Sequence, residues 1–331
     1  MIDQNSLKLL TNKKNLLAFS GGVDSTALFF LLIEAKISFD IAIVDYQIRQ
    51  QSKTEVQHAK ELAKTYNLTC HTFTAPKITQ NFEASARAIR YDFFHTLVDT
   101  YNYENILTAH HLGDRFEWML MQFCKGAGCA ELAGMKKVQK RDNYTLIRPL
   151  LHLDKQELFT YLHAKDIKYF IDESNFDESY KRNEFRNNIT LPLLQKYLVG
   201  IKKSFEYIDL DVASLLKEID VETIEDFGYL KTTSNTRNDI FIIDKYLKTK
   251  NYLLTANERK LLESETSIVV GRVFLIVKQD SFIFISPYNS VTSNMPKSFK
   301  EKMRRLKIDT KLRPYLFNNS MTCHKVEELL S

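Results

Sequence analysis

Ser20-Gly21-Gly22-Val23-Asp24-Ser25 lies between two apolar runs, one at 16–19 with the length of a buried strand and one at 26–32 typical of a buried helix. Adjacent glycines allow backbone torsion angles that other residues rarely adopt, so several N–H groups can point at one place. The N-terminus of the following helix adds its own N–H groups and its positive dipole. The stretch therefore predicts an anion site, with phosphate as the usual anion and with Asp24 and Ser25 at the helix N-cap.

This loop ends without Gly-Lys-Ser/Thr and lacks the dinucleotide fingerprint, so neither of those phosphate motifs is present. Two adjacent glycines alone would favour a tight strand-to-helix turn. The complete string resembles the pyrophosphate loop (PP-loop) of the N-type ATP pyrophosphatases. That resemblance implies cleavage of ATP between its α- and β-phosphates and activation of a substrate as its adenylate.

Bulk properties narrow the class of protein. The 331 residues predict two domains, and only 9 Gly and 6 Pro argue against long disordered segments. The net charge of +5 is compatible with a polyanionic partner without requiring one. None of the 4 cysteines forms Cys-x-x-Cys, so we expect no zinc and no iron–sulfur cluster. We expect no signal peptide and no membrane span, which needs ~20 apolar residues, and therefore a cytoplasmic enzyme.

The first half of the chain alternates strand and helix patterns. This rhythm predicts an α/β fold, a doubly wound and mostly parallel sheet, over residues 1–195. Ligands of such sheets bind beyond the C-terminal ends of the strands. The predicted strands are 15–19, 39–46, 68–74, 105–109 and 146–148. The predicted helices are 25–36, 52–66, 83–101, 114–124 and 154–165.

The second half, residues 196–331, is expected to form a smaller and mostly helical domain. Residues 191–230 and 239–264 have helical spacing of apolar side chains. Two β-rich runs at 267–277 and 282–286, with Lys278-Gln279-Asp280-Ser281 between them, predict a β-hairpin. We expect the boundary near 195–205, with a helical linker and an α+β region beyond it.

Polar residues that follow the predicted strands are the candidates for binding. Asp45 could bind a ribose or base edge, although alone it more often caps a turn. Arg87 and Arg90 form a basic strip on one helix face, which suits phosphate or is simply solvated. Asp114 and Glu117 project from one face near a helix N-terminus and could hold Mg²⁺ or a substrate ammonium, or merely compensate the helix dipole.

Several further motifs, taken in chain order, resemble one family over about 14–194: the bacterial tRNA(Ile)-lysidine synthases. Each motif is modest alone, and the ordered set is specific. The matching segments are Val44-Asp45-x-x-Ile48-Arg49, Asn81-x-Glu83-Ala84-x-Ala86-Arg87-x-x-Arg90-Tyr91, Ala109-His110-His111, Lys125-Gly126-Ala127-Gly128, Gly134-Met135, Arg148-Pro149-Leu150-Leu151, Asp172-x-Ser174-Asn175, Arg182-Asn183-x-x-Arg186 and Leu191-Pro192.

Two segments depart from that family's pattern. Tyr46 stands where the family usually has His. Gly113, Arg115 and Trp118 stand where it usually has Asp, Gln and Thr, while Asp114 and Glu117 are kept. These departures leave open a tRNA-binding protein with a degenerate ATP site. Another PP-loop tRNA-modifying or adenylating enzyme is the nearer alternative.

The resemblance implies a reaction and its partners. ATP, as its Mg²⁺ complex, would adenylate O2 of the wobble cytidine in the CAU anticodon of tRNA(Ile). The ε-amine of free L-lysine would then displace AMP and give lysidine, which changes codon reading from AUG to AUA and the charging identity from Met to Ile. The resemblance leaves open whether the enzyme is a homodimer.

The same resemblance, with the patterns above, assigns roles to residues. Catalytic roles fall to Asp24, Asp114 and Glu117, of which the last two would also bind lysine. ATP, with Mg²⁺ held through Asp24, would be bound by Ser20, Gly21, Gly22, Val23, Asp24, Ser25, Asp45 and His110. The arginines expected to contact tRNA are Arg87, Arg90, Arg182, Arg186, Arg304 and Arg305.

Arg304 and Arg305 belong to a basic segment at 297–313, with eight Lys and Arg against one Glu and one Asp. Such a segment fits contacts with a phosphate backbone. A solvated helix face is an equally good interpretation of the segment taken alone.

Overall fold

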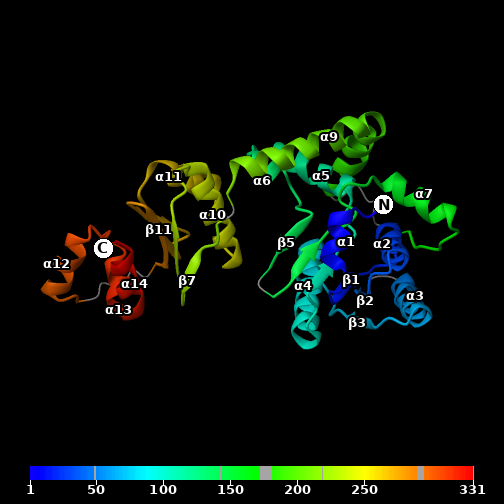
Figure 1. The fold of residues 1–331 in the computed structure, drawn as a ribbon, viewed down its shortest axis with the longest axis horizontal. Coiled ribbons are helices and arrows are strands. Elements are labelled where there is room, and N and C mark those ends of the chain that lie inside the picture. The colour runs from blue at the N-terminus through cyan, green and yellow to red at the C-terminus, as the bar shows by residue number, and fades with distance from the viewer. Residues whose placement is uncertain (48–49, 142, 172–180, 218, 289–293, 331) are drawn as a thin grey trace. The chain divides into compact units, whose positions relative to one another are not determined.

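The computed structural model describes residues 1–47, 50–141, 143–171, 181–217, 219–288 and 294–330. They form two compact units, Met1–Leu210 and Asp211–Ser331 (Figure 1). The motif residues Ile48 and Arg49, and the motif Asp172-x-Ser174-Asn175, lie outside the described residues. None of the helices within the described ranges is long and apolar enough to cross a bilayer.

The first unit contains a six-stranded sheet in the order β3-β2-β1-β4-β6-β5. The strands are β1 (Asn15–Ala18), β2 (Phe39–Asp45), β3 (Cys70–Thr74), β4 (Asn105–Leu107), β5 (Val138–Lys140) and β6 (Thr145–Ile147). All pair in parallel except β5, which runs antiparallel to β6 at the edge. The predicted parallel α/β fold is therefore confirmed. The sequence prediction missed β5, because a three-residue edge strand with two polar residues carries no clear period.

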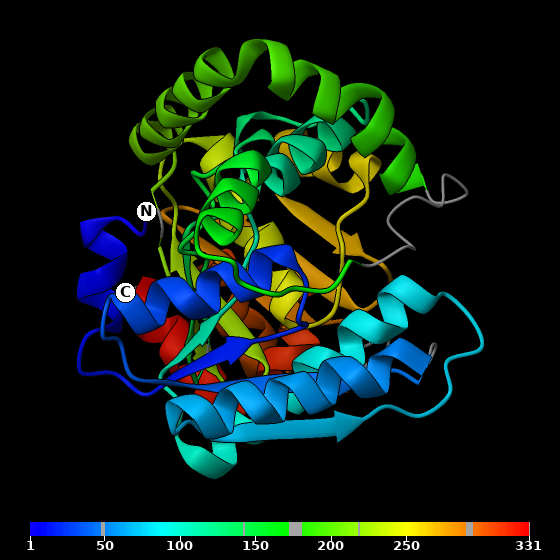
Figure 2. The ribbon, with the colours of Figure 1, turned by 90° about the vertical axis from the view of Figure 1, so that its right-hand side faces the viewer.

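Helices cover both faces of this sheet, as a doubly wound fold requires (Figure 2, in which α2 and α3 face the viewer). The helices of the first unit are α1 (Gln4–Leu10), α2 (Val23–Glu34), α3 (Gln50–Tyr66), α4 (Phe82–Tyr101), α5 (Leu112–Phe123), α6 (Cys129–Leu132), α7 (Lys155–Ala164) and α8 (Lys181–Phe185). A π-helical turn, Arg186–Thr190, leads into the long α9 (Leu191–Leu215), which continues into the second unit.

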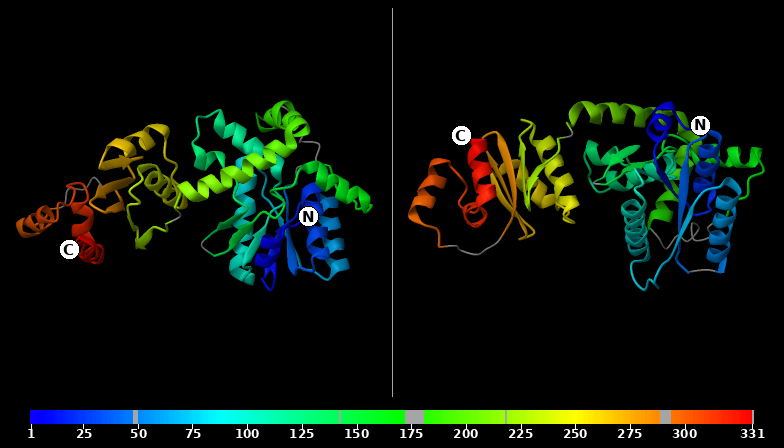
Figure 3. Two further views of the ribbon diagram at one scale, coloured as in Figure 1. Left: turned by 45° about the horizontal axis from the view of Figure 1, so that its top comes forward. Right: turned by 60° about the horizontal axis from the view of Figure 1, so that its bottom comes forward.

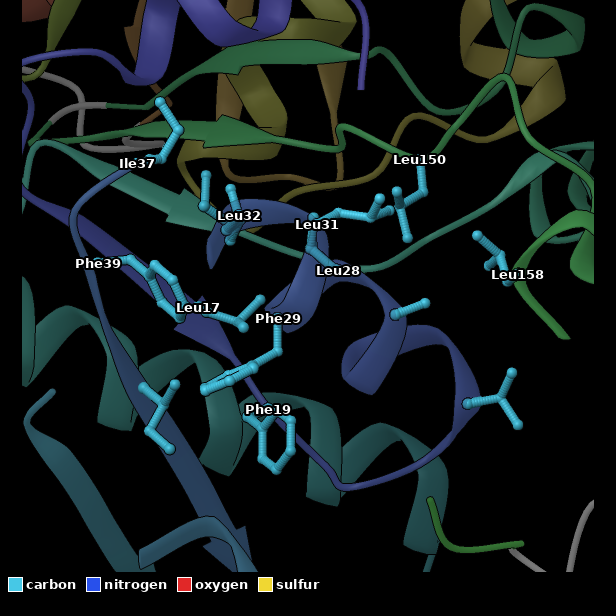
Figure 4. Packing of buried hydrophobic residues seen from close by; sticks show 14 of the residues in the cluster. Leu17, Phe19, Leu28, Phe29, Leu31, Leu32, Ile37, Phe39, Leu150 and Leu158 are labelled. Carbon is cyan, nitrogen blue, oxygen red and sulfur yellow. The ribbon is translucent and has the colours of Figure 1, made fainter. Parts of the chain in front are cut away.

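Alternate residues of the central strands point to opposite faces and divide the core of the first unit. Leu17 packs with α2, α3 and α7, whereas its neighbour Leu16 packs with α4. On the first face Phe29 is fully buried and meets Phe19 and Phe39 edge to face, with ring centroids 5.8 and 5.3 Å apart (Figure 4). This packing fixes α2 against β1, and so fixes the loop that joins them.

The second unit is built on a five-stranded antiparallel sheet in the order β7-β8-β11-β10-β9 (Figure 3). Its strands are β7 (Glu222–Ile224), β8 (Phe227–Lys231), β9 (Ser267–Val270), β10 (Phe274–Gln279) and β11 (Phe282–Pro287). One face packs on α10 (Thr236–Thr249) and α11 (Ala256–Ser264). The other packs on α12 (Lys297–Arg305), α13 (Arg313–Asn318) and α14 (Ser320–Leu330).

The predicted hairpin is confirmed as β10 and β11, which pair antiparallel from Phe274↔Pro287 to Gln279↔Phe282. The prediction of helix through 191–230 is wrong beyond α9, because β7 and β8 lie there. The run 227–230 of β8 is buried on every residue, so its strand shows none of the alternation that marks a half-exposed strand. Among its described residues the second unit therefore combines this antiparallel sheet with five helices, α10 to α14.

Candidate active site

The loop between β1 and α2 has the form that its glycines predicted. Gly21 adopts a left-handed backbone with φ of 77°, which glycine takes without strain. Gly22 is the N-cap of α2, and its carbonyl accepts from Thr26 N–H at 2.9 Å. The prediction of Asp24 and Ser25 as the cap is therefore wrong, since both lie in the first turn of the helix. The extended backbone of Gly22 completes the cap without a side chain.

Two hydroxyl groups close the loop on itself. Ser20 N–H donates to Ser25 Oγ at 3.2 Å, and the two Oγ atoms lie 3.1 Å apart. Ser25 is buried, and its hydroxyl also donates to the Gly22 carbonyl at 3.2 Å. These bonds hold the backbone amides of the loop in one arrangement before any ligand binds.

Phe170 contacts the loop from a distant part of the chain. Its N–H donates to the Gly21 carbonyl at 2.9 Å, and it forms a parallel bridge with Gly22. A Cβ on Gly21 would lie 3.2 Å from the Phe170 ring. No motif at residue 170 pointed to this contact, which depends on the course of the chain after α7.

A cavity of about 800 Å³ opens beside the loop, at the C-terminal ends of the strands. That volume is within the range of roughly 300–1,000 Å³ typical of ligand sites. Most of the predicted site residues of the first unit line it, and the lining members are Ser20, Gly22, Asp24, Ser25, Arg87, Arg90, His110, Asp114, Arg182 and Arg186. The predicted residues of this unit that are not among the lining residues are Gly21, Val23, Asp45 and Glu117. Asp45 instead accepts from Gln47 N–H at 2.8 Å and caps a turn.

Asp24 lines this cavity, and one of its carboxylate oxygens has no hydrogen-bond partner. Its Oδ1 is buried and has no hydrogen-bond partner, while its Oδ2 lies 3.8 Å from His111 Nε2. Burial raises the pKa of Asp24, and the neighbouring His111 opposes that rise. A buried carboxylate oxygen without a partner is costly, so this atom fits a bound cation or a cation-bound phosphate. The oxygen donor suits Mg²⁺, and it lies beside the loop that suits phosphate.

Asp114 and Glu117 lie on one face of α5, as predicted, and both bind arginines. Glu117 Oε1 accepts a short bond from Arg182 Nε, and its Oε2 accepts from Arg186 Nε at 2.9 Å. Asp114 Oδ1 lies 3.4 Å from Arg182 and 3.5 Å from Arg186. Glu117 is only 1% exposed, so both of its carboxylate oxygens are occupied within the protein.

These ion pairs set the charge states of the cluster. Burial alone would raise the pKa of Asp114, but His111, His110 and Arg182 hold it well below its usual range. Burial alone would lower the pKa of Arg182, but Glu117 and Asp114 raise it above its ordinary value. Burial lowers the pKa of His110 to about 4, so this cavity residue is neutral at physiological pH. The cavity therefore contains a firmly ionised Asp114 beside two cations.

Tyr46 fixes the basic strip on α4. Its hydroxyl donates to the Ala86 carbonyl at 3.0 Å and accepts from Arg90 Nε at 3.2 Å. Arg87 lies over the Tyr91 ring, with its guanidinium carbon 4.9 Å from the centroid. Tyr46 thus ties the end of β2 to the start of α4 and aims Arg90 along the cavity wall.

Arg115 in α5 is a structural residue. It is 6% exposed, binds Asp209 of α9 through both terminal nitrogens at 2.5 and 2.9 Å, and donates to the Ala133 carbonyl at 2.9 Å. Its guanidinium also lies 4.3 Å from the centroid of Phe205. Arg115 therefore joins α5 to α9, and Trp118 stays 45% exposed one turn further on.

The basic segment 297–313 lies in the second unit, and it is less uniform than its composition suggests. Arg304 and Arg305 are exposed on α12. Lys302 is paired with Glu327 at 2.6 Å, and Arg313 donates to the Ile308 carbonyl. The surface available to a polyanion is therefore a subset of the segment that includes both arginines.

These features define a PP-loop enzyme: the sheet is mostly parallel, serines close the PP-loop, and an Asp24 oxygen beside the cavity has no hydrogen-bond partner. Residues 2–193 match the PP-loop domain family. A solved structure of the U34-tRNA thiolase NcsA from Methanococcus maripaludis shares this fold, with a TM-score of 0.53 and 18% identity over 66% of this chain and 78% of that one.

Sequence relatives narrow the family further. The chain is 43% identical to the tRNA(Ile)-lysidine synthase of Helicobacter pylori strain 26695, over 94% of this chain and 91% of that protein. It is 41% identical to the tRNA(Ile)-lysidine synthase of Campylobacter jejuni strain RM1221, over 97% of each. The chain belongs to the tRNA(Ile)-lysidine synthase family.

Proposed function

We propose that this protein joins free L-lysine to C2 of the wobble cytidine of tRNA(Ile) with a CAU anticodon, at the expense of ATP. The observation that carries the proposal is one cavity bordered by the PP-loop, the orphaned Asp24 oxygen and the ionised Asp114. Phosphate, cation and ammonium can each find a partner there. Family membership supports the same reaction.

The PP-loop is proposed to hold the β- and γ-phosphates of ATP. Its backbone amides and the N-terminus of α2 supply N–H donors and positive dipole, fixed in advance by Ser20 and Ser25. Asp24 would hold Mg²⁺, which supplies Lewis-acid stabilisation of the phosphate charge when bound. Arg90, aimed by Tyr46, is proposed to contact a phosphate of ATP or of tRNA.

The first chemical step would be attack of cytidine O2 on the α-phosphorus. The O2–P bond forms, the bond to pyrophosphate breaks, and pyrophosphate leaves with its negative charge held by the loop. Oxygen at C2 is a poor leaving group until it carries AMP. Adenylation therefore prepares C2 for attack by an amine.

The second step would be attack of the lysine ε-amine on C2. The ammonium first gives one proton to water and becomes the amine. The C2–N bond then forms, the C2–O2 bond breaks, AMP leaves with O2, and the nitrogen gives a second proton to water. We assign Asp114 to the lysine ammonium, because its carboxylate is ionised and faces the cavity. A carboxylate with a lowered pKa is a weak base, so this residue suits binding of the ammonium better than removal of its proton.

Glu117 is assigned a positioning role within this scheme. Its side chain is buried away from the cavity and occupied by Arg182 and Arg186, so it would act on lysine through those arginines and through Asp114. The two arginines line the cavity, and a guanidinium group suits contact with phosphate.

The tRNA backbone is proposed to contact Arg304 and Arg305, because both are exposed on a basic helix. A cytoplasmic location follows from the proposed substrates, tRNA, ATP and free lysine. A homodimer stays a prediction, which light scattering of the purified protein would test.

The experiment is release of AMP and pyrophosphate from ATP, with lysine and tRNA(Ile) each present or omitted. We expect full turnover only when both are present. Asp24→Ala should abolish AMP formation without unfolding the protein, since no hydrogen bond to Asp24 Oδ1 is lost. Turnover that is independent of lysine would assign the chain to a different PP-loop reaction.

A further inference from the structure

His111 is a buried residue at the start of α5 that the reaction scheme leaves without a role. It is 8% exposed and forms the N-cap of the helix, with Nδ1 accepting from Gly113 N–H at 3.0 Å. Its own backbone N–H donates to Asp114 Oδ2 at 3.0 Å. One side of the imidazole is therefore used to begin the helix.

The other side of the ring faces two carboxylates of the site. His111 Nε2 lies 3.8 Å from Asp24 Oδ2 and 3.6 Å from Asp114 Oδ2. Because Nδ1 is the acceptor for Gly113, the neutral ring carries its proton on Nε2. That N–H group lies between two acids that would otherwise repel each other, slightly beyond hydrogen-bond distance of each.

The His111 ring fits between the two acids because residue 113 has no side chain. A Cβ at position 113 would lie 2.7 Å from His111 Cε1 and 3.0 Å from its Nδ1. Real Cβ atoms do not approach so closely, so any side chain at 113 would push the imidazole away. The absence of a side chain at Gly113 and the inward position of His111 thus form a single feature of the site.

We propose that His111 is a positioning residue that links the two halves of the site, by fixing Asp24 on the phosphate side relative to Asp114 on the lysine side, and that Gly113 is required for it. The inference rests on the proposed function for the roles of the two acids. The linkage itself rests on the geometry of the imidazole between them.

A purely structural cap and a positioning residue can be separated by one substitution. Asn places its side-chain oxygen where His has Nδ1, so His111→Asn keeps an acceptor for Gly113 N–H and removes the group at Nε2. His111→Ala removes both. A residue that only caps the helix would be replaced by Asn without loss, whereas a positioning residue would not.

Gly113→Ala tests the same idea from the other side of the contact. Displacing the ring loses its cap bond to Gly113 N–H, and the greater helix preference of alanine offsets that loss, so the variant should melt close to the wild type. Gly200→Ala is the matched control, because Gly200 also lies in a helix and a Cβ there meets nothing within 4 Å.

The experiment measures melting temperature, Mg–ATP affinity by calorimetry and kcat with lysine and tRNA(Ile). We expect His111→Asn to melt as the wild type does and to lose about 10- to 100-fold in kcat or Mg–ATP affinity, as loss of a supporting contact does. We expect Gly113→Ala to show the same loss as His111→Asn. We expect His111→Ala to show that loss and also to melt a few degrees lower. Gly200→Ala should match the wild type in all three measurements.

Wild-type kcat and wild-type Mg–ATP affinity in His111→Asn would overturn the inference and leave His111 as a cap. Loss of function in Gly200→Ala equal to that in Gly113→Ala would also overturn it. Failure of the proposed function has a different signature, namely a wild-type enzyme without lysine-dependent turnover. The Mg–ATP affinities of the variants would still decide the role of His111 in that case.

Discussion

Glu117→Gln tests whether this acid holds two arginines in place or binds a ligand. The substitution keeps the shape of the side chain and removes its charge. It weakens two charge-assisted hydrogen bonds, to Arg182 and Arg186, each worth about 1.5–3 kcal/mol. Removing one partner of a buried ion pair costs roughly 3–5 kcal/mol.

The expected loss in the free energy of unfolding is smaller than the sum of these contributions. The side chains of Arg182 and Arg186 are 36% and 23% exposed, so water can replace part of what Glu117 supplies. The glutamine oxygen also still accepts one bond. We therefore predict that Glu117→Gln lowers the free energy of unfolding by about 2–4 kcal/mol.

The matched control is Glu83→Gln, which touches the same Arg182. Glu83 lies 3.2 Å from the guanidinium, but its side chain is 63% exposed. An exposed pair is worth about 0.2–1 kcal/mol, so this variant should lose less than 1 kcal/mol.

Urea denaturation followed by tryptophan fluorescence suits this comparison. Trp118 is the single Trp of the chain and is next to Glu117 in α5, so the signal reports on the first unit. Equal stability of the two variants would refute the reasoning. Unchanged stability of Glu117→Gln with a raised KM for lysine alone would assign Glu117 to direct lysine contact.

Three further predictions concern other parts of the chain. Asp209→Ala should destabilise the first unit more than Arg115→Met in urea denaturation. Asp209→Ala leaves a 7% exposed guanidinium without its counterion, whereas Arg115→Met leaves a carboxylate that is 58% exposed. Equal losses in the two variants would contradict this. Asp114 has a pKa well below its usual range, so it should stabilise the fold above its unfolded pKa of about 3.9 and lose that effect as the pH falls through its folded pKa. The stability difference between wild type and Asp114→Asn should thus be constant from about pH 5 to 8 and shrink in stronger acid, and growth of the difference in acid would overturn the assignment. Charge reversal at Arg304 and Arg305 should raise the KM for tRNA and reduce its log–log salt dependence by about one unit for each lost contact, with the KM for ATP and lysine unchanged; an unchanged KM for tRNA would leave these arginines as a solvated face.

The core of the first unit and its PP-loop could be predicted from the sequence because their signals are local. The Gly21-Gly22 pair requires a special backbone, and the apolar runs on either side have the lengths of a strand and a helix. Both features lie within about 20 residues. Five of the six strands of the sheet, all except β5, followed from the same alternation of patterns.

Contacts between distant residues could not be predicted in this way. The pairing of Glu117 with Arg182 and Arg186 joins residues more than sixty positions apart, and nothing at 117 distinguishes an acid that faces a ligand from one that holds an arginine. Phe170 beneath Gly21 is a similar case. Such contacts depend on the course of the whole chain.

The sequence prediction missed short or fully buried elements for a different reason. β8 is buried on both faces, so its apolar run looks the same as a buried helix segment. The N-cap of α2 was assigned to Asp24 and Ser25 from side-chain preference, whereas the extended backbone of Gly22 takes that place. Local preference in both cases was overridden by how the segment packs.

Analysis of the modified nucleoside tests the central claim most directly. tRNA(Ile) with a CAU anticodon is incubated with the enzyme, Mg–ATP and isotopically labelled lysine, then digested to nucleosides and analysed by mass spectrometry. We predict one labelled lysine on the wobble cytidine for each AMP released, and none with Asp24→Ala. Label at another nucleoside, or AMP release without label in the tRNA, would contradict the account.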